Sequence, residues 1–576
     1  MKKFLIIFLI ILFFASCGEK KESTLITGNV KNDTENTISI GDSLLQITET
    51  GGFFFQIELT DPQIFSLKYQ QRQFEIFVVP GEKLEISFDA KNIDQSMTFK
   101  GKSAETNRYL FQVGKFYKKV GTYFPTYSKK WRSLYSKDEK IFIAELDSLK
   151  NSFRKSLDES AVNLNNVNDE VLFQKENGIE FTFAWMILQY PNFHKDFTSE
   201  KISLSPETKD YLESINLDDP RLLKVDEYSD LGDALIHLKI RQEFRTNNDL
   251  KKSDNRWLKA SFNVIERMFK NQKIKDFWRY HYLKKHIENN GVKHIKSFIE
   301  IFNKSCKSED LKQKINSLYN SELSKRNDHP IFTYKSVDGF NLDAHVFIPK
   351  DLKEGETRPA IIYFHGGSWS EGKPDWQFGY SKNGFISVCI EYRTYDRYGV
   401  LPFGQISDAK SAIRWMRENA KKFHIDPDKI IASGNSAGGH LALCTAMLDI
   451  LDEKDENLSI SSKPNALILT SAVYNVSHGV WFADLVNDKQ KLKEISPLQN
   501  IKKDLPPMLI FHGTEDTYSS PYNYCLEFVD KIRKAGNIIY FHPIKNREHF
   551  LWNYGDYWKI AGKAKKEFYE KLGYLH

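Results

Sequence analysis

A serine stands between glycines in the last third of the chain, in the sequence Gly434-Asn435-Ser436-Ala437-Gly438. An apolar run ending at Ser433 precedes it, and a helical pattern over residues 440–451 follows it. Small neighbours allow a sharp strand-to-helix turn, which exposes a hydroxyl at a helix N-terminus, where developing negative charge is favoured. This context predicts that Ser436 is a nucleophile for acyl transfer.

A second glycine-rich stretch lies upstream, in His365-Gly366-Gly367-Ser368-Trp369, directly after an apolar run. Ester hydrolysis passes through a tetrahedral oxyanion that backbone N–H groups must face, and glycine lets the backbone approach closely. We therefore expect Gly366, Gly367 and Ala437 to form an oxyanion hole. The alternative is a glycine-rich turn without function, but its place on the preceding half of the sheet favours the functional interpretation.

An acid and a base follow two later apolar runs. One run leads into His512-Gly513-Thr514-Glu515-Asp516, and the next leads into Arg547-Glu548-His549. A carboxylate at the C-terminal end of a strand can orient an imidazole. The chain order Ser436, Asp516, His549 is the order of α/β-hydrolases, and it differs from that of chymotrypsin-like and subtilisin-like enzymes.

Other titratable residues near these motifs have structural interpretations. His365 and His440 flank the proposed site and are expected to support its loops, and His512 is expected to pack beside the acid loop. His542 is a rival to the proposed base, but it comes directly after a predicted strand. Asp408 opens a predicted helix, so a helix cap or a loop brace suits it better than the role of acid.

The elements that must position these residues alternate between strand and helix from about residue 329 onward. This alternation predicts a mostly parallel sheet with helices on both faces. The predicted strands span residues 331–335, 341–349, 361–364, 385–392, 430–433, 466–469, 508–511 and 538–541, and the clearest helices span residues 405–422 and 521–534.

Taken together, the motifs resemble the esterase/lipase branch of the α/β-hydrolase fold, which includes carboxylesterases and acetyl-xylan-type carbohydrate esterases. The resemblance covers about residues 329–573, and it also rests on Glu391-Tyr392-Arg393, Asp408 with Trp415, Ser496-Pro497 and Pro506-Pro507. It implies a serine hydrolase that cleaves carboxylic esters through an acyl-enzyme, with Asp516 and not Glu515 as the acid. It also implies that no metal and no organic cofactor is needed.

The chain departs from the family pattern in two loops. A serine, Ser520, stands before Pro521 where the family usually has a valine, and Glu548 stands where a glycine often precedes the histidine. The stretch from 472 to 495, with His478, Trp481 and Phe482, falls where such enzymes build part of the substrate pocket. It is short and carries several charges, so we expect short acyl groups, acetyl above all, on small-molecule or carbohydrate esters.

The first residues predict a targeting segment, residues 1–17. Lys2 and Lys3 precede an apolar run over residues 4–14, which is too short to span a membrane as a helix. The following Ala-Ser-Cys resembles a bacterial lipobox, which implies lipidation of Cys17. We expect an exported lipoprotein in the envelope of a Gram-negative bacterium, on its outer membrane. The alternative is an ordinary signal peptide that is cleaved elsewhere.

Two further regions lie between this segment and the hydrolase region at 329–576. Residues 24–101 alternate with period two and are punctuated by turns, which predicts a small antiparallel β domain. It resembles the β-rich module that opens many lipoproteins of Gram-negative bacteria. Residues 105–327 show apolar positions at three- and four-residue intervals, which predicts an α-helical domain.

Composition limits the classes of partner and cofactor. The net charge of +6 over 576 residues is a weak excess without a basic-aromatic strip, which argues against nucleic acid. The five cysteines, Cys17, Cys306, Cys389, Cys444 and Cys525, contain no C-x-x-C pair, so neither a disulfide framework nor a zinc site is supported. Cys389 and Cys444 are expected to be buried thiols. The sequence leaves the oligomeric state open.

Two other functions remain as alternatives. One is a serine peptidase of the prolyl-oligopeptidase type, which shares the hydrolase domain but gates it with a β-propeller, and too few strands precede residue 329 to form one. The other is a binding lipoprotein with an inactive hydrolase scaffold, because fold alone does not establish function. An intact set of serine, histidine and aspartate argues against the second.

Overall fold

The computed structural model describes residues 21–120, 128–251, 253–375, 384–477, 479–517 and 520–575. The predicted signal peptide and Cys17 lie outside these residues. The chain forms two compact units, Met1–Leu235 and Ile236–His576, and the boundary falls inside the region that the sequence predicts as one helical domain. Among the described helices, none is long and apolar enough to cross a membrane.

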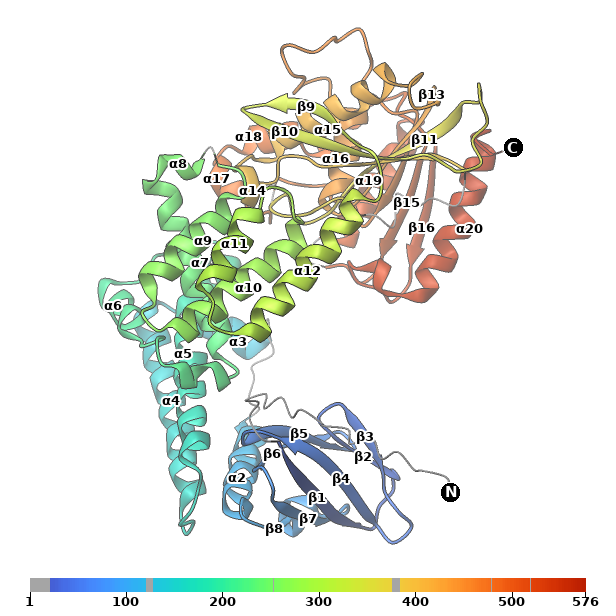
Figure 1. Cartoon of the computed structure of the whole chain (residues 1–576). Coiled ribbons are helices and arrows are strands. Elements are labelled where there is room, and N and C mark those ends of the chain that lie inside the picture. The colour runs from blue at the N-terminus through green and yellow to red at the C-terminus, as the bar shows by residue number, and fades with distance from the viewer. Residues whose placement is uncertain are drawn as a thin grey trace, which may run out of the picture. The chain divides into compact units, whose positions relative to one another are not determined.

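The first unit begins with two four-stranded sheets, ordered β4-β1-β7-β8 and β3-β2-β5-β6 (Figure 1). They share one hydrophobic core that includes Ile26, Leu67 and Leu84. Pairing is antiparallel except between β1 and β7, which run parallel, so the predicted all-antiparallel arrangement needs this correction. The strands are β1 Glu22–Lys31, β2 Thr37–Ile40, β3 Ser43–Gln46, β4 Gly52–Leu59, β5 Gln63–Tyr69, β6 Arg72–Val78, β7 Lys83–Asp89 and β8 Thr98–Lys100.

Helices complete the first unit. Several of them begin at side-chain caps; for example, Asp138 accepts from the Ile141 N–H, and Asn168 accepts from the Glu170 and Val171 N–H groups. The helices are α1 Ile93–Ser96, α2 Ala104–Val120, α3 Lys129–Tyr135, α4 Glu139–Ala161, α5 Asp169–Thr198, α6 Pro206–Ser214, η1 Pro220–Lys224 and α7 Tyr228–Thr246, which crosses the boundary.

The second unit opens with helices that precede its sheet in the chain. The end of the helical region that the sequence predicts over residues 105–327 is divided into separate helices here, because Asn271 and Ser308 each cap a new N-terminus. These helices are α8 Asn248–Lys251, α9 Arg256–Met268, α10 Gln272–Asn290, α11 Lys296–Ser305 and α12 Glu309–Asn327.

An eight-stranded sheet follows in the order β16-β15-β14-β13-β11-β12-β10-β9. Neighbours from β16 to β12 run parallel, and β10 and β9 continue the sheet antiparallel. This is the multidomain α/β-hydrolase arrangement that the sequence predicts. The strands are β9 Ile331–Val337, β10 Phe340–Phe347, β11 Arg358–Phe364, β12 Ile386–Ile390, β13 Ile425–Asn435, β14 Ala466–Thr470, β15 Met508–Gly513 and β16 Ile539–Ile544.

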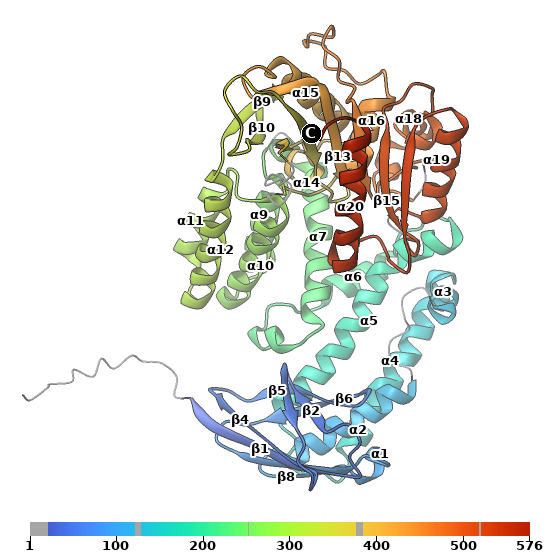
Figure 2. The ribbon, with the colours of Figure 1, turned by 90° about the vertical axis from the view of Figure 1, so that its right-hand side faces the viewer.

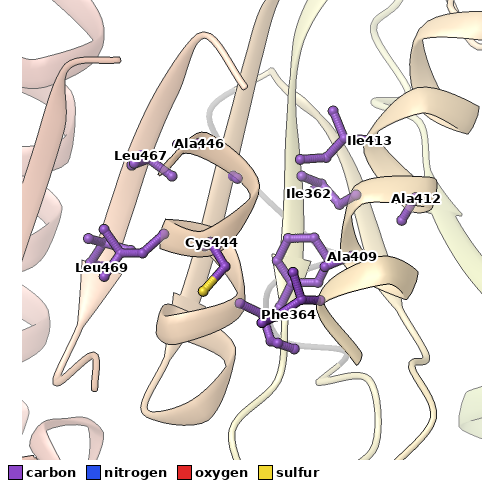
Figure 3. Close-up of a cluster of buried hydrophobic side chains, with 14 of the residues drawn as sticks. Ile362, Phe364, Ala409, Ala412, Ile413, Cys444, Ala446, Leu467 and Leu469 are labelled. Atoms are coloured by element: carbon purple, nitrogen blue, oxygen red, sulfur yellow. The ribbon is translucent and has the colours of Figure 1, made fainter. Parts of the chain in front are cut away.

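Helices cover both faces of this sheet. Alternate residues of β14 point to opposite faces, so Leu467 and Leu469 join the core beneath α15, α16 and α19, whereas Ile468 packs with α20. Figure 3 shows Leu467 and Leu469 close to Cys444 of α16, and Figure 2 shows α20 along the strands. The helices are α14 Tyr395–Tyr398, α15 Pro402–Glu418, α16 Ala437–Met447, α17 Ala483–Val486, α18 Lys489–Glu494, η2 Pro497–Gln499, α19 Tyr522–Lys534, η3 Leu551–Asn553 and α20 Gly555–Lys571.

Four cysteines lie in the described residues, and all are buried free thiols: Cys306, Cys389, Cys444 and Cys525. The expectation of buried thiols at Cys389 and Cys444 is confirmed. Burial raises the pKa of Cys525 to about 12, so this thiol stays protonated at neutral pH.

Candidate active site

Ser436 lies at the turn between β13 and α16. Its backbone has φ 51° and ψ −121°, a conformation that few non-glycine residues adopt. The turn is held by the Ser436 N–H, which donates to the Thr470 carbonyl at 3.1 Å. Gly438 is required for close packing here, because a Cβ atom at this position would lie 2.0 Å from the carbonyl oxygen of Phe364. The sequence context thus produces the sharp turn that it predicts.

Ser436, His549 and Asp516 come together from three loops at the same end of the parallel strands. The Nε2 atom of His549 lies 3.0 Å from Ser436 Oγ, and its Nδ1 atom lies 2.6 Å from Asp516 Oδ2. An ionised carboxylate only accepts, so Nδ1 carries the proton and Nε2 is free to accept from the serine hydroxyl. Asp516 is 2% exposed, which shields this contact from water. The arrangement is that of a nucleophile, a general base and an orienting acid.

The predicted oxyanion residues lie beside this serine. We call residues 366–372 the oxyanion turn. Within the described residues, the N–H groups of Gly366, Gly367 and Ala437 donate no hydrogen bond. Gly367 has φ 109°, and a Cβ atom on Gly366 would lie 3.2 Å from the Asn435 side chain, so the backbone approaches the nucleophile closely. These N–H groups can therefore receive a developing oxyanion.

Two serines to which the sequence assigns no role in the site, Ser520 and Ser471, hold the acid and base loops. The Ser520 N–H donates to Asp516 Oδ1 at 3.1 Å, and the Ser520 hydroxyl donates to the Ala472 carbonyl. The Ser471 hydroxyl donates to the carbonyl of His549 at 2.8 Å. Single hydroxyls without a motif give no sequence signal. Ser520 follows residues 518 and 519, which lie outside the described residues. It is the serine that stands before Pro521 in place of the family's usual valine, and its contacts give this departure a structural role.

The second departure leaves the geometry intact. Glu548 is exposed, and its backbone carbonyl packs where a Cβ atom on Gly513 would lie, at 2.4 Å. The loop that carries His549 is therefore positioned by backbone packing against the end of β15.

Three histidines near the site are buried and support its loops. Burial lowers the pKa of His365, His440 and His512 to about 4 in each case. His440 accepts from the Trp369 indole N–H at 3.3 Å and donates to the Ile495 carbonyl at 2.8 Å. His512 lies near the acid, at 3.6 Å from Asp516 Oδ2, but its Nε2 atom donates to the Ser520 carbonyl at 2.7 Å.

The rival residues occupy other places. His542 lies inside β16, not after it as the sequence suggests, and its ring stacks on Phe511 at 5.5 Å. Asp408 lies within α15 instead of opening it, and it is a brace that accepts from the Arg393 N–H and side chain and from Lys335. Neither is positioned to act on Ser436.

Aromatic rings lie against the oxyanion turn and against the base, and one of them, Trp481, belongs to the predicted pocket segment, whose His478 lies outside the described residues. The Trp481 indole N–H donates to the Ser368 carbonyl in the oxyanion turn at 2.7 Å, and Trp481 is 38% exposed. Its ring lies 4.8 Å from that of Tyr395. The exposed ring of Phe550 lies 5.2 Å from that of His549.

One group of residues in the described part of the chain has the donor atoms of a metal site, namely Asp343, His345 and Glu391. Both carboxylates already form ion pairs. Lys293 Nζ lies 2.7 Å from Asp343 and 2.9 Å from Glu391, and Arg326 contacts both. Burial alone would raise the pKa of Glu391, but the Lys293 ammonium and its neighbours hold that pKa well below its usual range. The cluster is therefore a buried ion-pair network.

Comparison with known proteins places the site in an esterase context. Residues 345–531 match the family model described as BD-FAE. The chain is 28% identical over 217 residues to a probable isoprenylcysteine alpha-carbonyl methylesterase of Arabidopsis thaliana, covering 33% of this chain and 44% of that protein. It is 30% identical over 190 residues to the esterase LipQ of Mycobacterium tuberculosis, covering 29% and 44%.

Among solved structures, a thermophilic esterase of Thermogutta terrifontis is 35% identical, covers 43% of this chain and 94% of that one, and has a TM-score of 0.41. The chain spans about half the length of the curated relatives that it matches. The resemblance of the C-terminal region to esterases, which the motifs predict, is confirmed by the family match and the curated relatives.

Proposed function

We propose that the protein hydrolyses carboxylic esters through an acyl-enzyme on Ser436. The observation that carries this proposal is the unbroken chain of contacts from Ser436 Oγ to His549 Nε2 at 3.0 Å and from His549 Nδ1 to Asp516 at 2.6 Å. The oxyanion turn lies beside the serine, and the curated relatives named above are esterases by name. The proposed catalytic residues are therefore Ser436, His549 and Asp516.

The reaction follows from this geometry. His549 Nε2 takes the Ser436 hydroxyl proton while the serine oxygen attacks the ester carbonyl, and the N–H groups of Gly366, Gly367 and Ala437 stabilise the oxyanion. Collapse breaks the ester C–O bond, and the imidazolium gives its proton to the departing alcohol. Water then attacks the acyl-enzyme with His549 as base, which releases the acid and restores the serine. Asp516 holds the tautomer and stabilises the imidazolium.

The test is Ser436→Ala. The variant should fold, since alanine also fits the tight turn, and it should lose hydrolysis of p-nitrophenyl acetate and labelling by a fluorophosphonate probe. Circular dichroism and thermal unfolding provide the folding control. Substantial esterase activity in the Ser436→Ala variant would disprove the proposal. A wild-type protein that folds but reacts with neither reagent would support the alternative of an inactive binding lipoprotein.

We further propose that the natural substrates are short-chain esters, acetyl above all, and that carbohydrate esters are favoured. The described residues of the segment available as a lid between β14 and η2 form two short helices, α17 and α18, and the segment carries Asp484, Asp488, Lys489 and Lys491. Long acyl chains need a larger apolar surface than this segment offers. Partly exposed rings such as Trp481 give flat surfaces suited to sugar rings.

Kinetics on two substrate series test this specificity. We expect kcat/KM for p-nitrophenyl acetate to exceed that for octanoate and longer esters, and we expect acetate release from acetylated xylan oligomers. A clear preference for long chains would contradict the first expectation. Release of no acetate would contradict the second and leave a general esterase. Cleavage of peptides would favour the peptidase alternative, although no β-propeller is formed by the described residues before residue 329.

Export and lipidation at Cys17 are part of the proposal, and their basis is the sequence pattern of residues 1–17. A single acyl chain anchors a protein only weakly, so bacterial lipoproteins carry several. We expect the wild-type protein to fractionate with the outer membrane of a Gram-negative host and to partition into detergent, and Cys17→Ser should abolish both. A mature protein that begins elsewhere and stays in the aqueous phase would contradict this proposal.

A further inference from the structure

We infer that the helical segment of the second unit, residues 254–326, positions the oxyanion turn, with Arg256 and Asn289 as positioning residues for the proposed reaction. The inference rests on the proposed function. The segment lies before residue 329, outside the region of resemblance to esterases, yet it contacts the two stretches of chain that border the turn.

The first set of contacts reaches the turn through α14. The backbone N–H groups of Tyr395 and Asp396 donate to the carbonyls of Trp369 and Ser370, at 3.0 and 2.8 Å. Arg256 in turn donates to the Tyr395 carbonyl at 3.0 Å and stacks on the Tyr395 ring at 4.4 Å. Arg256 is 5% exposed, so water does not compete for these contacts.

A second residue pair fixes the same short helix. Arg397 donates to the Asn255 side chain at 3.1 Å and forms an ion pair with Asp254 at 3.2 Å. Arg397 is buried, and Asn255 itself donates to the Lys293 carbonyl within the helical segment at 3.0 Å. The α14 helix therefore cannot shift without breaking buried charged contacts to residues 254–256.

The second set of contacts holds the end of the turn. Asn289 donates to the Glu371 carboxylate at 2.9 Å, and the Gly372 N–H donates to the Asn290 side chain at 3.4 Å. Lys373 donates to the Ile287 carbonyl at the C-terminal end of α10, at 3.2 Å. A cation is favoured at that end of a helix. Three consecutive residues are thus attached to one helix end.

The turn itself transmits this attachment to the oxyanion donors. The carbonyl of Gly367 accepts from the N–H groups of Ser370 and Glu371, at 3.0 and 3.1 Å, so the turn is closed on itself. A displacement of Glu371 therefore moves the peptide that carries the Gly367 carbonyl and, through it, the neighbouring donors. An error of about 1 Å in such a donor can cost ~100-fold in rate, whereas ground-state binding depends on it far less.

The experiment compares the full-length wild-type chain with Asn289→Ala, Arg256→Met and Arg256→Lys. We expect the first two variants to lower kcat for p-nitrophenyl acetate by ~10-fold and to leave KM within about two-fold. Inactivation by a fluorophosphonate should slow in parallel, because its phosphonyl oxygen occupies the same hole. Arg256→Lys keeps a donor for the Tyr395 carbonyl and should recover part of the rate.

Asn303→Ala is the matched control. It removes an amide pair between α11 and α12, where Asn303 and Asn316 exchange hydrogen bonds at 2.9 and 3.1 Å and neither bond involves the oxyanion turn or α14. This variant should keep the wild-type kcat. The inference is overturned if Asn289→Ala retains kcat within about two-fold, or if its loss of rate equals that of Asn303→Ala. Failure of the proposed function is distinct, because the wild type would then be inactive.

Discussion

Glu515 and Asp516 are adjacent carboxylates with different surroundings. Asp516 is buried and contacts His549 Nδ1 at 2.6 Å, whereas Glu515 is exposed. We expect Asp516→Asn to lower kcat by ~10⁴-fold, because the amide can stabilise the wrong imidazole tautomer. Glu515→Gln should keep activity within about two-fold. Steady-state kinetics on p-nitrophenyl acetate measure both.

The reverse ranking of these two variants would show that the structure places the wrong carboxylate against the imidazole. A control for folding is available, because Asp516→Asn keeps the volume of the side chain and an acceptor for the Ser520 N–H, which now contacts Asp516 at 3.1 Å. Its midpoint of unfolding in urea should therefore stay near that of the wild type, and the loss should fall on kcat.

Three buried histidines near the site predict a pH dependence of stability. Burial lowers the pKa of His365, His440 and His512 to about 4 in the folded chain, against about 6.5 when unfolded. The unfolded chain thus binds more protons between these values, so acid favours unfolding. Their contribution, on the order of 1–3 kcal/mol each, is fully present above pH 6.5 and is lost as the pH falls toward 4.

Urea unfolding at a series of pH values tests this. The free energy of unfolding of the second unit should fall steadily from pH 6.5 to pH 4. The slope should persist in ~0.5 M salt, because salt screens surface charges and not buried rings. A free energy that is flat over this interval would contradict the burial of neutral rings.

The sequence predicts the residues whose chemistry depends on a local pattern. Ser436 and the glycines lie in short motifs that need particular backbone conformations, and His549 and Asp516 follow strands in the expected order. Ser471 and Ser520 escape prediction, because each contributes one hydroxyl or N–H through contacts that only the fold creates.

At the scale of elements, the packing of α16 against β11 sets the distance between nucleophile and oxyanion turn. A Cβ atom on Gly438 would lie 2.0 Å from the Phe364 carbonyl and 2.5 Å from that of His365. We expect Gly438→Ala to force the two elements apart, to destabilise the second unit by ~1–3 kcal/mol and to lower kcat. Urea unfolding and steady-state kinetics measure the two effects.

Gly562→Ala is the matched control in another helix. A Cβ atom there meets no atom within 4 Å, and Gly562 lies inside α20. Alanine is the better helix former, so this variant should gain ~0.5–1 kcal/mol of stability and keep full activity. If Gly438→Ala behaved like Gly562→Ala, the close approach of α16 to β11 would not be needed.

The bounds of strands and helices are predicted well where the local sequence pattern is strong. The direction of strand pairing is not predicted, because it depends on residues far apart in the chain. The buried strands β14 and β15 are apolar runs and are found within two residues of their observed bounds, whereas the predicted strand over residues 430–433 covers only the buried middle of β13. The parallel pairing of β1 with β7 is not visible, because strand direction depends on a register between residues such as Ile26 and Leu84 that lie far apart in the sequence. The caps at Asn271 and Ser308 were available signals for dividing the helical pattern.

At the scale of the whole molecule, the boundary of the second unit lies well before the region of resemblance to esterases. Two buried carboxylates lie in the sheet: Asp343 belongs to β10, and Glu391 directly follows β12. Their ion-pair partners, Lys293 and Arg326, belong to the helical segment. Composition and motifs do not reveal such pairs, because Lys293 and Glu391 are 98 residues apart in the chain. The sequence pattern changes from helical to alternating strand and helix near residue 329, but the ion pairs join residues on both sides of that position.

This network predicts how truncated chains behave. Residues 329–576 alone keep the triad but lose Lys293 and Arg326, which removes the ion-pair partners of Asp343 and Glu391 at a cost of ~3–5 kcal/mol. That cost is a large part of a typical stability of ~5–15 kcal/mol. We therefore expect this chain to be insoluble or unfolded, whereas residues 226–576, which retain α7 to α12, should fold and hydrolyse p-nitrophenyl acetate.

Neutralising the carboxylates separates the charge effect from the loss of other contacts. Glu391→Gln with Asp343→Asn in the 329–576 chain removes the buried charges without changing their volume, so it should raise the yield of soluble, cooperatively unfolding protein. The rate of ester hydrolysis should stay low, because this chain lacks Arg256 and Asn289, which hold the oxyanion turn in place. The contrary outcome is an unmodified 329–576 chain that unfolds at the same urea midpoint as the 226–576 chain. That result would show that neither the helical segment nor its ion pairs with Asp343 and Glu391 stabilise the sheet.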